Sequence, residues 1–81
     1  MIKIVLSMKN IDLSQEQIGT VFYTRDYSKV KLIERIGSDL YRFEVDIFNT
    51  FDTQIRIYNK RGNILQADMR KSHPLDLIEK Q

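Results

Sequence analysis

The chain has 81 residues, of which 42% are hydrophobic and four each are Phe and Tyr, a composition typical of one small folded domain and not of a disordered segment. It contains no cysteine, which excludes a disulfide framework, a thiolate nucleophile and a cysteine zinc site. Thirteen Lys or Arg residues against eleven Asp or Glu residues leave a net charge of +2, too small by itself to indicate a nucleic-acid partner.

The first half of the chain predicts short strands separated by turns, because apolar side chains recur at every second position. Strands are expected over residues 2–8, 20–24 and 29–36, with a turn at 25–28. Ser14 and Gln17 have the spacing of a capping box, which indicates one helical turn between the first two strands. The alternation is interrupted at Ile33, where we expect an irregularity in the strand.

The clearest strand follows a reversal at residues 37–39. Its apolar side chains alternate with charged ones, and all four are expected in the core: Tyr41, Phe43, Val45 and Ile47. After a second reversal at residues 49–52, residues 53–58 predict a strand with Ile55 and Ile57 facing inward. The same alternation turns the other side chains of this strand outward, namely Gln54, Arg56 and Tyr58.

The last third of the chain predicts a hairpin turn at residues 60–63, in which Gly62 supplies a positive φ. A further strand is expected from three alternating apolar residues, Leu65, Ala67 and Met69. Residues 72–79 have the signals of a short helix. The sequence therefore predicts a mostly β fold, a small antiparallel SH3-like barrel or curved sheet of five to six strands with a short C-terminal helix. We expect this single domain to span residues 1–81.

The residues give little support for catalysis. The chain has one histidine, His73, and no pattern that resembles a nucleophile elbow, a P-loop or a HExxH helix. Glu44 and Asp46 alternate along one strand face, which would place two carboxylates about 7 Å apart, but alternating charge is ordinary on the solvent face of a strand. We therefore expect a binding protein with no enzymatic activity, no cofactor and no metal site.

A basic and aromatic cluster near the predicted hairpin indicates a binding surface. Residues 56–71 contain five Lys or Arg residues and one Asp, a balance of +4, whereas residues 31–55 contain three basic and five acidic residues, a balance of −2. Cationic groups attract phosphates, and an outward ring can stack on a base. The predicted nucleic-acid-binding residues are Arg56, Tyr58, Lys60 and Arg61, with help from Arg25, Lys29 and Lys31. The alternative is that these charges only keep the hairpin soluble.

Several short matches to a known domain lie between Ile18 and Asp68. They are Ile18-Gly19 with Phe22 and Thr24, Tyr27 with residues 30–34, Phe48 with Thr50 and Thr53, and residues 59–62 with Asp68. On these residues the chain resembles a small domain that recurs in bacteriophage proteins, often beside HNH-type or AP2-type DNA-binding segments. It departs from that domain at Phe51 and Asp52, where a Gly-aromatic pair is expected. The resemblance implies a compact SH3-like β-barrel that serves phage DNA or RNA transactions.

Residues 41–47 together with residues 54–65 also look like strands of PepSY-type domains, an α+β family whose members bind or inhibit proteins. This second resemblance implies a protein-binding function. The alternative to nucleic-acid binding is therefore a protein-interaction module, for example a phage inhibitor of a host protein. Such a module would bind through a strand edge or through the apolar tail formed by Leu75, Leu77 and Ile78. The longest apolar stretch, residues 4–6, is too short to span a membrane, so we expect no membrane partner and a cytoplasmic location, in the host if the chain is phage-encoded.

Overall fold

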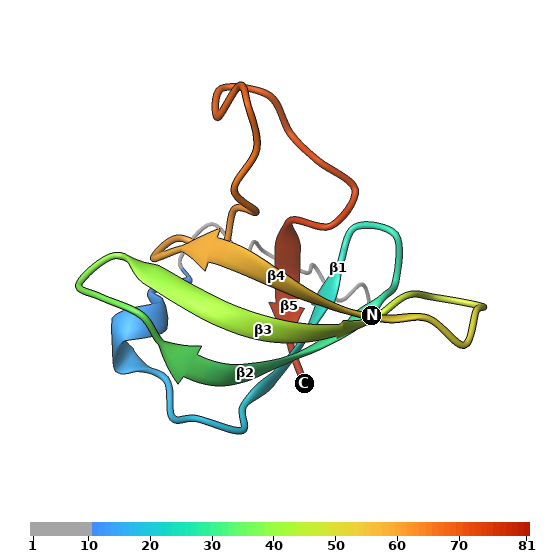
Figure 1. Cartoon of the computed structure of the whole chain (residues 1–81), viewed down its shortest axis with the longest axis horizontal. Coiled ribbons are helices and arrows are strands. Elements are labelled where there is room, and N and C mark those ends of the chain that lie inside the picture. The colour runs from blue at the N-terminus through green and yellow to red at the C-terminus, as the bar shows by residue number, and fades with distance from the viewer. Residues whose placement is uncertain (1–10) are drawn as a thin grey trace, which may run out of the picture.

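The computed structural model of the protein describes residues 11–81, which form a five-stranded antiparallel sheet (Figure 1). The strands are β1 (Val21–Thr24), β2 (Lys29–Arg35), β3 (Leu40–Asp46), β4 (Thr53–Asn59) and β5 (Leu77–Lys80). Their order across the sheet is β4-β3-β2-β1-β5, so the last strand pairs with the first. The mostly β prediction is confirmed. The strand predicted over residues 2–8 lies outside the described residues.

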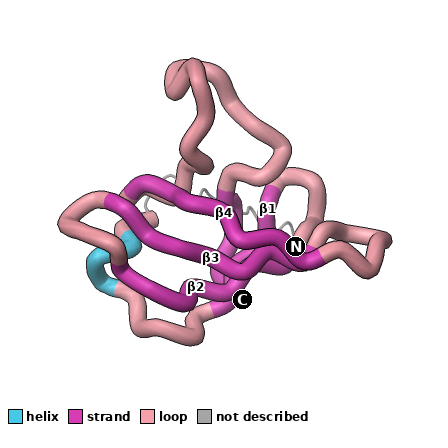
Figure 2. The backbone as a smooth tube through the Cα atoms, viewed as in Figure 1, coloured by secondary structure: helices cyan, strands magenta, loops and turns pink. Residues whose placement is uncertain are grey.

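The sheet is strongly curved and is not closed into a barrel. β2, β3 and β4 run side by side, whereas β1 and β5 turn away from them at a steep angle, and a long loop connects β4 to β5 (Figures 1 and 2). The curvature lets one sheet enclose a core. The core residues are Leu13, Phe22, Val30, Leu32, Tyr41, Phe43, Val45, Tyr58, Ile64, Leu75 and Leu77.

The central strands follow the predicted alternation. Tyr41, Phe43 and Val45 of β3 are buried, and Ile47, just after the strand, is partly buried against the same core. The predicted irregularity near Ile33 is confirmed, because the pairing of β2 with β3 shifts there by one residue. An extra residue in one strand of an antiparallel pair bends that strand and increases its twist. The bulge therefore contributes to the curvature of the sheet.

The predicted orientation of β4 is wrong. Tyr58 pairs with Tyr41, and Arg56 pairs with Phe43, so these two residues of β4 share the core face of β3. Tyr58 is fully buried, whereas Ile55, on the opposite face, is 54% exposed. Period-two alternation defines two faces without saying which one is buried. A tyrosine buries more apolar area than an isoleucine, and here its hydroxyl also finds a hydrogen-bond acceptor.

The predictions for the C-terminal third are also wrong in two places. Residues 65–69 form a loop beyond an isolated bridge between Tyr58 and Ile64, and Leu65 and Met69 are exposed. The loop is ordered by local bonds: the Asp68 carboxylate accepts the N–H of Arg70 at 3.0 Å. The short helix expected over residues 72–79 is absent, and β5 occupies residues 77–80 instead. The edge of β1 supplies the pairing partner that the tail needs to form a strand.

The helical part of residues 11–81 is limited to one 3-10 turn, η2 (Leu13–Gln15). The single helical turn was predicted, but its cap is Asp12, whose side chain accepts the N–H of Ser14 at 3.0 Å. This bond and the hydroxyl of Ser14 hold the pKa of Asp12 below its ordinary value of 3.8. None of the helical structure in this part of the chain is long and apolar enough to cross a bilayer.

Candidate binding surfaces

The predicted basic and aromatic hairpin is only partly on the surface. Arg56 is half-buried and its Nη1 donates to Oε1 of Gln54 at 3.1 Å. Tyr58 lies in the core, where its ring centroid is 4.8 Å from that of Phe43 in an edge-to-face arrangement. Tyr58 is therefore not available to stack on a base. Lys60 and Arg61 are exposed on the turn after β4.

The supporting cations lie elsewhere and have carboxylates near them. Nζ of Lys31 is 3.9 Å from Oε1 of Glu44, and Lys29 pairs with Asp46 across the β2–β3 ladder. Together with Val21, these four side chains line a shallow hollow of about 220 Å³ on the outer face of the sheet. Lys29 and Lys31 lie on the same face of the sheet as Glu44 and Asp46. The alternating charge of the hollow leaves neither a basic patch nor a free carboxylate pair.

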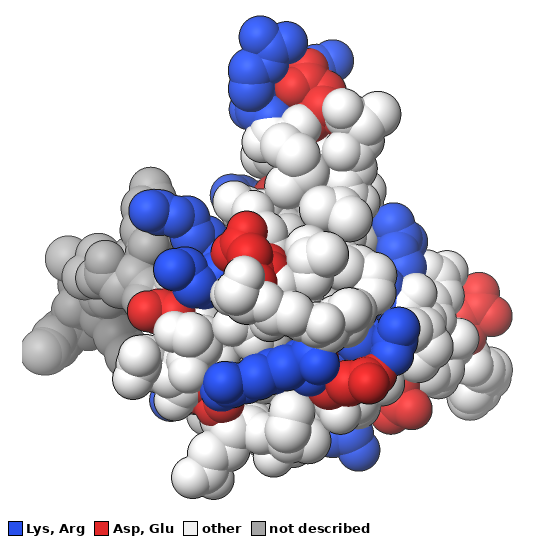
Figure 3. All heavy atoms as spheres, turned by 60° about the vertical axis from the view of Figure 1, so that its left-hand side comes forward, with Lys and Arg blue, Asp and Glu red and all other residues white. Residues whose placement is uncertain are grey.

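The structure does not bring the predicted site residues into one patch. Lys29, at the start of β2, lies beside the end of β3 at Asp46. Lys60 follows the end of β4, where Asn59 pairs with Leu40 at the start of β3. The two groups are therefore at opposite ends of the sheet. On the face shown in Figure 3, Lys and Arg side chains form several separate groups, most of them next to Asp or Glu.

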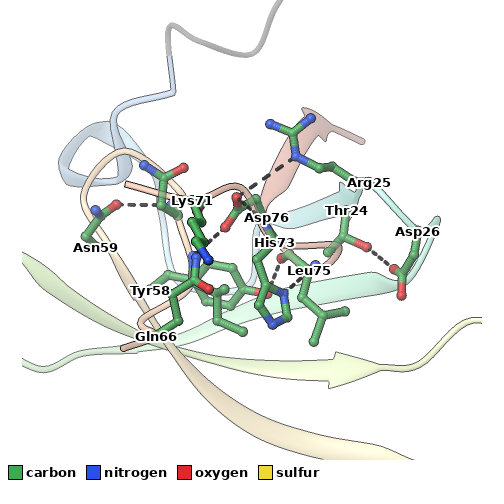
Figure 4. A network of polar contacts seen from close by, with 12 residues as sticks. Thr24, Arg25, Asp26, Tyr58, Asn59, Gln66, Lys71, His73, Leu75 and Asp76 are labelled. Carbon is green, nitrogen blue, oxygen red and sulfur yellow. Dashed lines mark hydrogen bonds and ion pairs between the residues drawn. The ribbon is translucent and has the colours of Figure 1, made fainter. Parts of the chain in front are cut away.

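Arg25, the remaining predicted site residue, borders a polar network centred on the buried carboxylate of Asp76 (Figure 4). Oδ1 of Asp76 accepts the N–H of Ile64 at 2.9 Å, and Oδ2 accepts the N–H of His73 at 2.9 Å. Nε of Arg25 lies 4.0 Å from Oδ2. Tyr58 donates its hydroxyl to the carbonyl of Leu75 at 2.6 Å in the same region. The network satisfies backbone groups, so it has a structural role.

This network bridges the two edges of the open sheet. On one side, Leu65 N–H donates to the carbonyl of Ile57 in β4 at 2.8 Å. On the other side, Leu77 N–H, at the start of β5, donates to the carbonyl of Gly62 at 2.9 Å. Residues 62–65 thus stand between β4 and β5, and the Asp76 carboxylate adds the bond to Ile64 that a ladder partner would otherwise make.

Three aromatic side chains are exposed at one end of the sheet. Tyr27, in the β1–β2 turn, is 70% exposed, and Phe48 and Phe51, in the β3–β4 loop, are 58% and 107% exposed. The rings of Tyr27 and Phe48 lie 6.1 Å apart in an edge-to-face arrangement. The loops are joined because Phe48 N–H donates to Oγ of Ser28 at 2.9 Å. We call Tyr27, Phe48 and Phe51 the aromatic end.

The backbone of the aromatic end is held in position by a polar turn. Hydrogen bonds link Thr24, Asp26 and Ser28, and Ser28 N–H donates to both of the other side chains. Partial burial disfavours the charged form of Asp26, but the bonds from Thr24 and Ser28 outweigh it and lower the pKa of this carboxyl below 3.8. The turn places Tyr27 at a φ of +67°, a conformation that bulky residues rarely adopt and that costs about 1–3 kcal/mol.

Sequence reasoning missed the aromatic end because residues 49–52 were interpreted only as a reversal. The available signal was Phe51 itself, because an aromatic residue in a tight reversal lies outside both strands and is not directed into the core by their alternation. Its position therefore indicated an exposed aromatic side chain. Asp76 was missed for a different reason. Its role depends on Ile64, twelve residues away in the chain, and no local pattern indicates that contact.

Comparisons of the chain with protein-family models, with curated proteins and with solved structures found no match.

Proposed function

We propose that this chain is a protein-binding module that contacts its partner through the aromatic end. The observation that carries the proposal is the full exposure of Phe51, which lies in the same loop as Phe48, whose ring packs edge-to-face on that of Tyr27. Grouped exposed aromatic side chains are uncommon on small monomeric proteins and mark interaction sites, where Tyr and Phe are enriched. The strained backbone of Tyr27 supports the same conclusion, because its ring remains 70% exposed and its burial does not offset the strain.

The charges around the aromatic end favour a protein partner over a nucleic acid. The β1–β2 turn contributes Arg25 and Asp26, which offset each other. The β3–β4 hairpin contributes Asp46 and Asp52, both exposed, and the start of β2 contributes Lys29, which lies opposite Asp46. Such a surface has no excess of positive charge to attract phosphates, whereas an apolar protein surface with a mixed polar rim fits it. We do not assign the contact to the apolar tail, because Leu75 and Leu77 are buried in the core and Ile78 is partly buried.

The test is affinity capture from the source cells, followed by binding measurements with the purified captured protein. Phe51→Ser removes the side chain that has no packing partner to lose, so the fold stays intact. We expect it to weaken binding about tenfold or more, as for the aromatic anchor of an interface. Ile36→Ser is the matched control, since Ile36 is also exposed but lies after β2 at the other end of the sheet. Equal affinities of wild type and Phe51→Ser would refute the proposal.

Nucleic-acid binding is a second candidate, supported by the +4 balance of residues 56–71. Its contacts would be Lys60, Arg61 and Lys71, all exposed and with no ion-pair partner within residues 11–81. Asp12 lowers the local field, because its carboxylate interacts with the charges of Lys60 and Arg61. The double change Lys60→Ala and Arg61→Ala should reduce the slope of log affinity against log salt by about 1.4–1.8. An unchanged slope, or no binding at low salt, excludes this candidate.

We also propose that the chain is related to the SH3-like domains of phage proteins. The curved antiparallel sheet and the turn at residues 59–62 support it. A phage source would also place the chain in the host cytoplasm, which fits a binding module directed at a host protein. We propose no cofactor and no catalytic role for it.

A further inference from the structure

The connection from β4 to β5 contains a segment, residues 66–72, that stands apart from the fold, and we call it the projecting loop. In Figure 1 this loop extends away from the sheet, and residues 69–72 are all exposed. Its hydrogen bonds are internal: Nε2 of Gln66 donates to the carbonyl of Lys71 at 2.7 Å, and Lys71 N–H donates to the carbonyl of Asp68 at 3.1 Å. None joins the loop to the remainder of the chain that the structure describes.

The chain on both sides of the projecting loop is held in place. Just before the loop, Leu65 N–H donates to β4 at 2.8 Å. Just after it, His73 N–H donates to Oδ2 of Asp76 at 2.9 Å. The carbonyl of Pro74 then accepts the N–H of Asp26 at 3.0 Å. Because no residue of the loop is buried, the loop can open locally while both flanks keep their bonds.

Two adjacent cationic side chains, Arg70 and Lys71, lie on the projecting loop. The side chain of Arg70 is 91% exposed despite its ion pair with Asp68, and Lys71 is also exposed. Endopeptidases that cut after Arg or Lys bind this side chain with a carboxylate in their specificity pocket, and exposed loops are where they cut folded proteins. We infer that Arg70 and Lys71 form the site at which such an endopeptidase cuts this protein.

The cut is a hydrolysis of the peptide bond after Arg70 or after Lys71. It consumes one water, whose oxygen joins the carbonyl carbon as the C–N bond breaks. Both protons of the water pass to the released nitrogen, so the products are a carboxylate and an ammonium group.

A second basic pair, Lys60 and Arg61, is also exposed but is held differently. The carbonyl of Lys60 accepts the N–H of Leu13 at 2.8 Å, a contact with a distant part of the chain. Gly62, which follows the pair, is buried, and its carbonyl accepts the N–H of Leu77 at 2.9 Å. A protease could bind this turn only after these long-range contacts had opened. Exposure of a basic pair is therefore not sufficient, and the projecting loop is the favoured site.

The C-terminal piece released by the cut keeps its place in the fold. Leu75 and Leu77 are 6% and 5% exposed in the core, and Oδ1 of Asp76 accepts the N–H of Ile64 at 2.9 Å. β5 also remains paired with β1. All of these contacts lie outside the projecting loop, so the cut protein is two chains in one fold. The inference is independent of the proposed function, because the loop contains no residue of the aromatic end.

The test is digestion of the folded protein with a low concentration of trypsin, followed by intact-mass spectrometry. We expect the first cut within residues 11–81 to follow Arg70 or Lys71. The two pieces should elute together in size-exclusion chromatography and separate only when urea is added. The double change Arg70→Gln and Lys71→Gln should slow the first cut about tenfold or more, because the remaining sites open only with the rest of the fold.

The matched control is the double change Lys60→Gln and Arg61→Gln, which removes the other exposed basic pair and should leave the rate of the first cut unchanged. All four substituted side chains are exposed, so both variants are expected to fold, which circular dichroism verifies. A first cut elsewhere within residues 11–81, an unchanged rate for the variant of the projecting loop, or pieces that separate without urea would overturn the inference. Each of these outcomes leaves the Phe51 binding test unaffected.

Discussion

The reversed orientation of β4 gives the most direct test of the structure, because it predicts opposite results for two residues of one strand. Tyr58 is fully buried against Phe43, so Tyr58→Ala removes a large core ring and should lower the free energy of unfolding by about 3–5 kcal/mol. Ile55 is 54% exposed, so Ile55→Ala should change it by no more than about 0.5 kcal/mol. If the alternation were oriented as the sequence suggests, the ranking would be inverted.

The free energies are measured by urea unfolding followed by circular dichroism. A domain of this size has a small free energy of unfolding, so Tyr58→Ala is expected to be largely unfolded in water. Tyr58→Phe keeps the ring and removes only the bond to the Leu75 carbonyl, with an expected cost of about 1–3 kcal/mol. A larger cost for Ile55→Ala than for Tyr58→Phe would contradict the orientation of β4.

Three further predictions concern stability. Burial raises the pKa of Tyr58 well above its ordinary value of 10.0, so the stability contributed by the neutral phenol is complete below pH 10.0 and is lost as the pH rises further. Above pH 10.0 the free energy of unfolding of wild type should fall by up to about 1.4 kcal/mol per pH unit relative to Tyr58→Phe, as measured by urea unfolding. Asp76→Ala leaves the N–H groups of Ile64 and His73 without their acceptor and should lower the free energy of unfolding by about 3 kcal/mol in the same assay. Asp76→Asn keeps one acceptor oxygen and should cost less. Equal costs for the two variants would contradict the role of Asp76 as the acceptor of both bonds. Both Gly62 and Gly19 have a positive φ, but only at Gly62 would a new Cβ lie close to another residue, 3.2 Å from the Cβ of Leu77. Gly62→Ala should therefore lower the melting temperature more than Gly19→Ala. Equal shifts in melting temperature would show that this close contact has no energetic cost.

The candidate sites were much less predictable than the strands. Charge counting located Lys60 and Arg61 on an exposed turn, and the structure agrees with that placement. It could not show that Lys31 lies 3.9 Å from Glu44, since the two residues are brought together only by pairing of β2 with β3. Nor could it show that Tyr58 is buried. A charge count includes only residues that are close in the sequence, whereas a binding patch is formed by residues that are close in space and exposed.

The sequence alone determined the local elements: the alternation of Tyr41, Phe43 and Val45, the irregularity near Ile33, and the turn that requires Gly62. These depend on side-chain period and on allowed φ, which act over a few residues. The tertiary structure alone decided which face of β4 is buried and that residues 77–80 become a strand. A period-two pattern is symmetric with respect to its two faces, so only the register with β3 selects one. A short tail has no preference strong enough to fix its own conformation, so the open edge of β1, more than fifty residues earlier in the chain, determines it.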